Sequence, residues 1–302
     1  MAKNSLIKYA NIGDTIEIEG LTNLFGTFFS DRLTSAATIV LATVLFLGLF
    51  GQFLAPYDYT RQFEAEDGGI DALSPPSADH WLGTTADGRD VLSRVLYGAQ
   101  PTALTGLLGG GLIVTIGLTV GVISGYVGGK IGTVLMRFTD FVYGVPLIPF
   151  ALVMASVIGI GFWTVILIIG ALLWRSSARV IRSQVLQIRE RPFIMSAQAL
   201  GASRSRIIRK HIFPNIMGMA ALYFALGIGY SIIFQASLAF IGVSNPFVPS
   251  WGIMIRNAYN EFVLIDGWWW SAPPVILISV TVVSTFIVGR AFEEDDDSLV
   301  AQ

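Results

Sequence analysis

Long apolar runs alternate with shorter polar segments along almost the whole of this chain. Each run approaches the roughly 20 apolar residues that one α-helix needs to cross the hydrocarbon core of a bilayer. The pattern therefore predicts an all-α, polytopic membrane protein with about six transmembrane helices. The expected spans are 36–55, 101–127, 141–160, a run that begins at residue 162 and enters a basic segment, 216–241, and 268–289.

Local features refine these spans. Gly144 and Pro146 predict a kink in the third run, which a short basic turn with Lys130 and Arg137 should precede. In the second run, glycines recur at four-residue spacing (106/110 and 117/121/125), and small residues at this spacing let helix backbones approach closely. Helix packing is the preferred interpretation of these glycines, with a ligand-binding role as the alternative. The tryptophans 268–270 are typical of an aromatic anchor at the membrane interface.

The composition supports the same class of protein. Of the 302 residues, 53% are hydrophobic and 13% are charged, whereas ordinary soluble domains carry about 25% charged residues. The chain contains no cysteine, which excludes disulfides, thiolate metal sites and cysteine nucleophiles. A cleaved signal peptide has a short charged start and an apolar core of about 7–15 residues, so the longer polar start and the longer first run predict a retained span.

The distribution of charge predicts the orientation of the spans. Residues 175–215 include nine Lys or Arg and one acid, whereas residues 56–97 include eight acids and three arginines. Short cytoplasmic loops carry the excess of Lys and Arg, so the basic segment is expected inside and the acidic segment outside. The resulting plan has a cytoplasmic N-terminal segment (1–35), a six-span domain (36–290) with external loops 56–100 and 242–267 and a cytoplasmic loop 183–215, and an acidic cytoplasmic tail (291–302), so both termini are cytoplasmic.

The cytoplasmic loop has the features of a docking element. A proline can open a helix, because its missing N–H costs nothing at the first helical position. A glycine is preferred just past a helix C-terminus, and a serine is a good cap for a second short helix, here 204–211. Two short helices with little side-chain bulk could enter a groove on a partner, and flanking arginines would orient them. The residues assigned to this element are Pro192, Ser196, Ala197, Ala199, Leu200, Gly201, Ser203, Arg204, Arg206 and Pro214.

Two other interpretations of this loop compete with docking. A basic loop without any partner would also satisfy the positive-inside rule, but it would not explain the ordered series of proline, small residues, glycine, serine and proline. Nucleic-acid binding is not expected, because the basic patch lies between spans and lacks interleaved aromatic side chains for base stacking.

The same segment carries a family resemblance. Residues 193–215 resemble the EAA loop of ABC-importer permeases, the element that docks on a cytoplasmic ATPase. Met195-Ser196-Ala197 stands where that family most often has Glu-Ala-Ala, while Gly201 and Ile212-Phe213-Pro214 match the rest of the pattern. Further segments resemble the dipeptide/oligopeptide/nickel branch of the family, and the second of its two permease subunits, in family order over about residues 36–290. These segments are 80–84, 87–94, 136–140, 237–242 and 249–252.

The resemblance implies a type I (MetI-like) importer permease bundle that works by alternating access in the cytoplasmic membrane, with no catalytic residue, metal or cofactor of its own. It implies a heterodimer with a second permease, two cytoplasmic ABC ATPases and an extracytoplasmic substrate-binding protein. The chain itself has no GxxxxGK[ST] phosphate loop, so ATP hydrolysis by that route would reside in partner subunits. Peptides are the first substrate expected from this branch, and nickel chelates or oligosaccharides are the alternatives.

Residues 89–98 and Asp140 carry open alternatives. Residues 89–98 have the pattern of an amphipathic helix at the outer interface, either contacting the binding protein through Arg89, Asp90 and Arg94 or packing between loop and bundle. Asp140 is expected to pair with Arg137 three residues earlier, with a transport site as the alternative. The two histidines, at positions 80 and 211, lack metal-ligand spacing.

Two other functional classes would require different residues in the spans. An ion channel would need a continuous polar pore lining, and an intramembrane enzyme would need paired ionisable groups at depth. The expected spans offer almost none of the first, and only Asp140 approaches the second.

Overall fold

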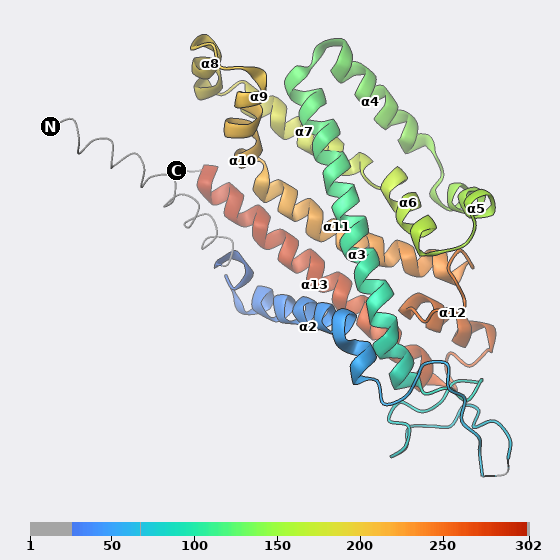
Figure 1. The fold of residues 1–302 in the computed structure, drawn as a ribbon. Coiled ribbons are helices and arrows are strands. Elements are labelled where there is room, and N and C mark those ends of the chain that lie inside the picture. Colours follow the sequence, from blue (N-terminus) through green and yellow to red (C-terminus); the bar gives the residue numbers. More distant parts are fainter. Residues whose placement is uncertain (1–25, 67, 301–302) are drawn as a thin grey trace.

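The computed structural model describes residues 26–66 and 68–300, which form a helical bundle with one long irregular loop (Figure 1). Residues 1–25 of the expected N-terminal segment and residues 301–302 of the expected tail lie outside the described residues. The longer helices are α2 (Arg32–Leu54), α3 (Val91–Val122), α4 (Gly129–Gly144), α5 (Leu147–Ile158), α6 (Phe162–Leu172), α7 (Arg175–Arg189), α11 (Met217–Phe240), α12 (Trp251–Asn260) and α13 (Trp268–Val300). The short elements are α8 (Pro192–Ala199), α9 (Arg204–Ile207), α10 (Phe213–Asn215) and two π-helical turns, η1 (Ile123–Val127) and η2 (Ile208–Ile212).

The number of spans agrees with the expectation from the apolar runs. Within the described residues, five helical segments are long and apolar enough to cross a membrane, and the count becomes six if the bent pair α4 and α5 is one span. The five segments are Arg32–Leu54, Val91–Val127, Phe162–Arg189, Met217–Phe240 and Trp268–Phe292.

The third run is broken instead of merely kinked. Helices α4 and α5 meet at 89°, at the position where Gly144 and Pro146 predicted a bend. Val145 adopts an extended conformation (φ −78°, ψ 118°), because a residue that precedes proline is disfavoured in the α region. The expectation of a basic turn around Lys130 and Arg137 was wrong, since both residues belong to helix α4.

The basic segment after residue 174 is only partly a water-facing loop. Its first part forms α7, which packs along α3 and buries Ala178, Ile181, Val185 and Ile188. Apolar residues at these three- and four-residue intervals lie on one face of a helix. The arginines of α7 occupy its other faces, so the free loop begins only after Arg189.

The glycines of α3 serve helix packing. A Cβ on Gly110 would lie 2.9 Å from the backbone nitrogen of Ile228 in α11, and one on Gly121 would lie 2.9 Å from the carbonyl oxygen of Ala178 in α7. Because these backbones nearly touch, α3 is fixed between α7 and α11. The packing interpretation of the glycine spacing is therefore confirmed.

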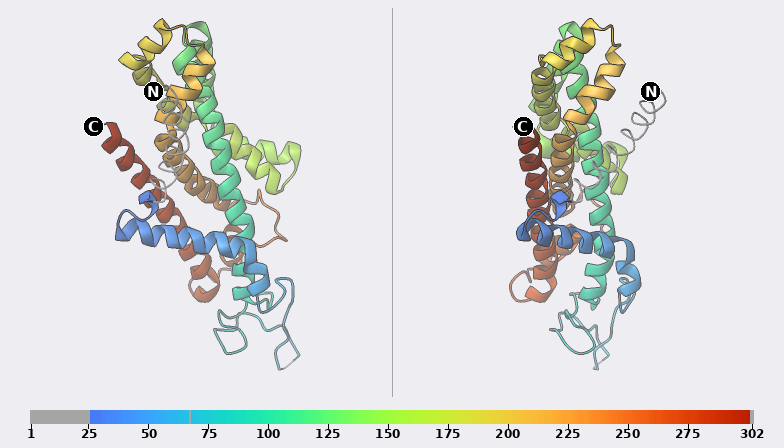
Figure 2. Two further views of the ribbon diagram at one scale, coloured as in Figure 1. Left: turned by 60° about the vertical axis from the view of Figure 1, so that its left-hand side comes forward. Right: turned by 90° about the vertical axis from the view of Figure 1, so that its left-hand side faces the viewer.

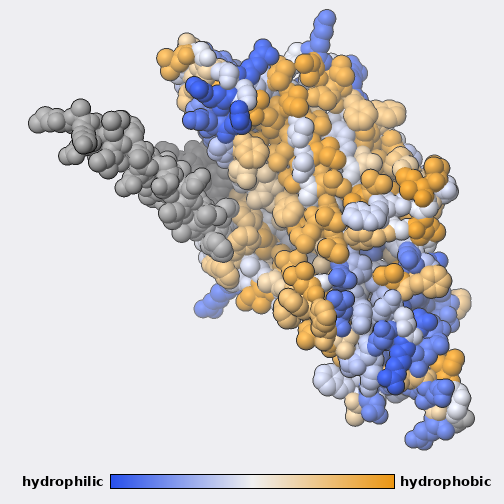
Figure 3. Space-filling view, in the orientation of Figure 1, coloured by the Kyte–Doolittle hydropathy of each residue, from blue (hydrophilic) through white to orange (hydrophobic). Residues whose placement is uncertain are grey.

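The two polar regions lie at opposite ends of the bundle. Helices α8–α10 form a corner at one end, and the irregular loop between α2 and α3 lies at the other, with α12 and the start of α13 nearby (Figures 1 and 2). On the face seen in Figure 3, the surface between them is mostly apolar, whereas hydrophilic side chains gather at the two ends. This is the arrangement expected of a bundle that spans a bilayer.

Helices occupy part of both segments that the sequence predicted as external loops. Helix α3 begins at Val91, inside the expected loop 56–100, and α12 occupies the middle of the loop 242–267. Trp251 opens α12, is completely buried, and donates a hydrogen bond from Nε1 to the carbonyl oxygen of Val95 at 3.1 Å. Of the three tryptophans expected as an interfacial anchor, Trp268 is 58% exposed, whereas Trp270 is 3% exposed and packs inward.

Candidate functional site

The corner formed by α8, α9, η2 and α10 connects α7 to α11, and we call it the coupling corner (residues 190–216). Its first helix begins as the sequence predicts. Arg191 is extended (φ −72°, ψ 144°) and Pro192 occupies the first turn of α8, where a missing N–H leaves no hydrogen bond unmade. The Ser196 hydroxyl donates back to the carbonyl oxygen of Pro192 at 3.0 Å.

Helix α8 ends in a Schellman motif. The backbone N–H of Ala202 donates to the carbonyl oxygen of Ala197 at 3.0 Å, and that of Gly201 donates to Gln198 at 2.9 Å. This pair of bonds requires a left-handed residue after the helix, and Gly201 has φ +77°. A Cβ at this position would meet nothing within 4 Å. The backbone conformation, and not lack of space, therefore favours glycine at this position.

The second half of the corner is capped by Ser203 as predicted, but it is not one regular helix. The Ser203 hydroxyl accepts a hydrogen bond from the backbone N–H of Arg206 at 3.4 Å. The expected helix 204–211 appears as α9 followed by the π-turn η2. Pro214, in the first turn of α10, has no N–H to donate, and a widened turn just before a proline adjusts for the missing bond. Ile216 (φ −112°, ψ 4°) then separates the corner from α11.

A cluster of isoleucines fastens the coupling corner to the bundle. Ile194 of α8, Ile207 of α9, and Ile212 and Ile216 are each 1% exposed or less. They pack in one cluster with Val122 at the end of α3, Tyr126 of the turn η1, and Ile181, Val185 and Ile188 of α7. Burying one such side chain contributes about 1.5–3 kcal/mol, so the corner and the ends of α3 and α7 are expected to move together.

The outer face of the coupling corner is exposed and partly apolar. Leu200 is 89% exposed, Met195 52% and Phe193 40%. Of the residues assigned to docking from the sequence, only Ala197 is half-buried, and it packs against the isoleucine cluster. The exposed ones are Pro192, Ser196, Ala199, Leu200, Gly201, Ser203, Arg204, Arg206 and Pro214. The corner therefore presents a small-residue surface with a few apolar side chains and a cationic flank.

Sequence reasoning did not identify the isoleucine cluster or the apolar side chains at positions 193 and 195. The apolar positions 207, 212 and 216 were visible in the sequence, but a π-turn shifts their spacing away from that of an α-helix. Which apolar side chains face inward was decided by packing on α3 and α7.

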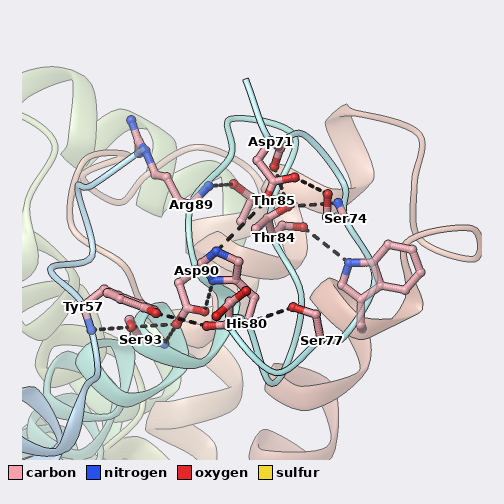
Figure 4. A network of polar contacts seen from close by, with 12 residues as sticks. Tyr57, Asp71, Ser74, Ser77, His80, Thr84, Thr85, Arg89, Asp90 and Ser93 are labelled. Atoms are coloured by element: carbon pink, nitrogen blue, oxygen red, sulfur yellow. Dashed lines mark hydrogen bonds and ion pairs between the residues drawn. The ribbon is translucent and has the colours of Figure 1, made fainter. Parts of the chain in front are cut away.

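At the opposite end, a buried polar network organises the loop before α3 (Figure 4). His80 Nδ1 lies 2.9 Å from Asp90 Oδ1, and Asp90 Oδ2 accepts hydrogen bonds from the N–H and the hydroxyl of Ser93, each at 2.7 Å. Asp90 therefore caps α3 and holds His80 at the same time. Trp269 Nε1 donates to the carbonyl oxygen of Thr84 at 3.3 Å, which ties the loop to α13.

This burial decides between the alternatives left open for residues 89–98. No separate interfacial helix exists in this part of the described structure, because these residues lead directly into α3. Asp90 is 2% exposed and Arg94 3% exposed, so neither side chain offers a surface to a partner, and the packing alternative holds for both. Arg89 is half-buried, with its N–H donating to Thr85 Oγ1 at 3.2 Å.

Asp140 pairs with a different arginine from the one expected. Its Oδ1 lies 2.8 Å from Arg179 Nη2 of α7, whereas Arg137 was the expected partner. The guanidinium groups of Arg175 and Arg179 also lie over the Tyr143 ring, at 4.9 and 4.3 Å. These contacts hold the end of α4 against α7, so Asp140 has a packing role at the surface. Among the described residues, no cluster of His, Cys, Asp or Glu could hold a metal ion.

Comparison with known proteins adds an independent line of evidence. Residues 117–295 match the family described as "Binding-protein-dependent transport system inner membrane component". The chain is 32% identical over 266 residues to the dipeptide transport system permease protein DppC of Bacillus subtilis, which covers 87% of this chain and 81% of the relative. It is 33% identical over 232 residues to the oligopeptide transport system permease protein OppC of Haemophilus influenzae, which covers 76% and 73%.

Two further matches extend the comparison. The glutathione transport system permease protein GsiD of Pectobacterium atrosepticum is 30% identical over 239 residues, covering 78% of each chain. Among solved structures, a chain of the MetNI methionine ABC transporter in an inward-facing conformation aligns with a TM-score of 0.55. The two chains are 18% identical, and the alignment covers 68% of this chain and 96% of the transporter chain. At this identity the match shows a similar fold only.

Proposed function

Because this chain belongs to the family of binding-protein-dependent transport system inner membrane components, we propose that it is the second permease of an ABC importer that carries di- and oligopeptides into the cell. Family membership makes it a multi-pass inner-membrane subunit of a transport system, and not an enzyme. It also implies a separate ATPase and a binding protein as partners. In the proposed assembly the chain forms a heterodimer with a different permease, on which two cytoplasmic ATPases dock.

The coupling corner is the docking element in this proposal. Its exposed face, from Phe193 to Gly201, would enter a groove on one ATPase, and Arg204 and Arg206 would orient it by charge. The isoleucine cluster is the observation that carries the proposal, because it joins this exposed face to the ends of α3 and α7. When the ATPases close around ATP, a push on α8 would be transmitted to these two helices.

Alternating access follows from such a connection. Helices α3 and α7 are in backbone contact through Gly121 and Ala178, so they would rotate as one unit. The transporter needs only two rigid arrangements whose balance the ATPases shift. In one, the cavity between the two permeases opens toward the binding protein, and in the other it opens toward the cytoplasm.

The orientation in the membrane is part of the proposal. Cations at the coupling corner (Arg204, Arg206, Arg209 and Lys210) support a cytoplasmic location for that end, in agreement with the positive-inside rule. The acid-rich loop at the opposite end would then face the binding protein. Trp81, 72% exposed, is accessible there, whereas Arg89 is half-buried. Both termini would be cytoplasmic.

The substrate class rests on what the relatives transport. The similar proteins are named for dipeptides, oligopeptides and glutathione, and all of these contain amide-linked amino acids. Peptides therefore remain the preferred substrate class for this chain.

The proposal can be tested on the assembled importer. The chain is co-expressed with its partner permease and ATPases, purified, and placed in nanodiscs with the binding protein. We expect the ATPases to co-purify, and ATP hydrolysis to rise several-fold when the binding protein is loaded with tri-alanine. Purification of the chain without an ATPase, or peptide flux that needs no ATP, would contradict the proposal.

A further inference from the structure

A cavity of about 110 Å³ lies between α3, α6, α11 and the segment that leads into α12. Its polar lining comes from Thr105 of α3, Gln235 of α11, and Ser244, Asn245 and Ser250 of that segment. This is several times the ~15 Å³ that a single water molecule requires. The cavity is near the end of the bundle that carries the acid-rich loop, opposite the coupling corner.

Gln235 is the residue that makes this cavity a candidate binding site. It is 5% exposed, and its Nε2 donates to the Ser250 hydroxyl at 3.0 Å. Its Oε1 is buried and has no hydrogen-bond partner among the described residues. Exchanging the oxygen and nitrogen of the carboxamide would leave the amine without a second partner instead. Either way, a buried polar group keeps unused hydrogen-bonding capacity beside the cavity, which native structures rarely leave without a reason.

The rest of the lining indicates what chemistry would satisfy Gln235. None of the described residues that line the cavity is charged, so the site would not select the charged ends of a substrate. Hydroxyl and carboxamide groups offer both donors and acceptors. Phe162 and Val165 of α6 supply an apolar wall. A neutral group with one N–H and one C=O in a plane matches this combination.

We propose that this cavity binds a peptide group of the transported substrate, with Gln235 as the residue that reads its N–H and C=O. The inference rests on the proposed function, and it assigns a substrate contact to the outer half of the bundle in the proposed orientation. A site that reads the backbone amide and no charged group would accept peptides of different sequence. Gln235 is polar but uncharged, so it can be placed at membrane depth at moderate free-energy cost.

The test uses the complete importer in proteoliposomes, with tri-alanine and its analogue methylated on both peptide nitrogens as probes. Gln235→Met keeps the side-chain length and removes its hydrogen bonds. The control is Ser237→Ala on the same helix, because Ser237 is exposed and its hydroxyl bonds only back to Ile233, at 2.9 Å. Comparing each variant with the wild type cancels the selectivity of the binding protein, which is the same throughout.

We expect Gln235→Met to slow tri-alanine uptake about fivefold to tenfold, within the range typical of a lost hydrogen bond. It should slow uptake of the methylated analogue less, because that analogue has no N–H left to donate to Gln235 and keeps only its C=O groups. Ser237→Ala should leave both rates unchanged. If Gln235→Met slows both probes equally, the residue supports packing and the proposal is wrong. If it slows neither, the proposal is also wrong. Absence of any peptide uptake by the wild type would overturn the proposed function itself, which separates the two failures.

Thiol labelling gives a second, independent measurement. Because the chain has no cysteine, Gln235→Cys introduces a single thiol, whose labelling is followed by the mass of this chain. A small cationic methanethiosulfonate added from outside should modify Cys at this position, and less so during ATP-driven uptake of tri-alanine. Ser237 does not line this cavity, so the labelling of Ser237→Cys should not change during ATP-driven uptake of tri-alanine. Lack of modification at position 235 in every state would show that the cavity is not on the substrate path.

Discussion

The imidazole of His80 and the carboxylate of Asp90 lie 2.9 Å apart at the start of α3, and both side chains are almost completely buried. The same carboxylate accepts the backbone N–H of Ser93. Asp90 therefore joins the loop that carries His80 to the first turn of a membrane-spanning helix. The loop is held by an interaction that forms only when α3 is in place.

This relationship predicts a difference between two substitutions of Asp90. Asp90→Ala removes the helix cap, which should lower the free energy of unfolding by about 0.5–2 kcal/mol. It also leaves a buried imidazole nitrogen without a partner, which should lower it by about 1–3 kcal/mol more. Asp90→Asn keeps an oxygen for the Ser93 N–H and an amide for His80, so it should lose less than half as much stability. The measurement is thermal unfolding of the purified chain in detergent. Equal losses for the two variants would contradict the role given to Asp90.

Two glycines of the same helix should respond to alanine in opposite directions. Gly121→Ala places a Cβ 2.8 Å from Ile181 Cγ2 and 2.9 Å from the Ala178 carbonyl oxygen, and overpacking of this kind destabilises by about 1–3 kcal/mol. Gly111→Ala meets nothing within 4 Å, so it should stabilise the helix by about 0.5–1 kcal/mol. Both effects are measured as shifts in unfolding midpoint in the same detergent. A stable Gly121→Ala variant would show that α3 and α7 do not pack as closely as described.

Because Gly201 is left-handed, we expect a substitution at this position to impair peptide-stimulated ATP hydrolysis only if the new residue disfavours that backbone conformation. Gly201→Val strains φ +77° by about 1–2 kcal/mol without any steric clash, so the end of α8 should shift while the bundle remains folded. We expect tri-alanine-stimulated ATP hydrolysis to fall severalfold. Gly201→Asn is the control, because asparagine tolerates this conformation, and it should retain most of the stimulation. If the valine variant keeps full stimulation with an unchanged melting temperature, α8 is not the coupling element.

The exposed side chain of Leu200 predicts where the ATPase docks. Leu200→Glu puts a charge on a side chain that is 89% exposed, so the fold should be unaffected while an apolar interface would lose affinity. We expect the amount of co-purified ATPase to fall at least about tenfold, as for a central interface residue. The matched control is Ile265→Glu, equally exposed at 84% but at the opposite end of the bundle. ATPase retained with Leu200→Glu, or lost equally with both variants, would place the docking surface elsewhere.

Much of the coupling corner was predictable because its chemistry is local. Pro192 begins α8, Gly201 ends it, and Ser203 caps the next turn, all within a stretch of twelve residues. Proline, glycine and serine impose their conformations through their own backbone and nearest neighbours. Such features can be inferred from sequence without knowledge of any distant contact.

The sequence did not predict the surroundings of residues whose contacts come from distant segments of the chain. For Arg94 the sequence left surface contact and packing open, and the fold buries it, with its Nη1 3.5 Å from the backbone carbonyl oxygen of Tyr59. Asp140 was expected to pair within its own helix, but Arg179 lies closer, 39 residues away. The unpartnered oxygen of Gln235 also depends on segments that meet only in the folded bundle. None of these pairings has a signature in local spacing.

The amino-acid sequence by itself determined that this chain crosses a membrane about six times, because a bilayer requires long apolar runs. It also determined the turn chemistry of the corner between α7 and α11 and the side on which its cations are expected. Only the tertiary structure decided which faces of α7 and α8 are buried, how sharply α4 and α5 bend, and which polar groups meet. The physical reason is that hydropathy and turn propensities act over a few neighbouring residues, whereas side-chain packing joins segments far apart in the chain.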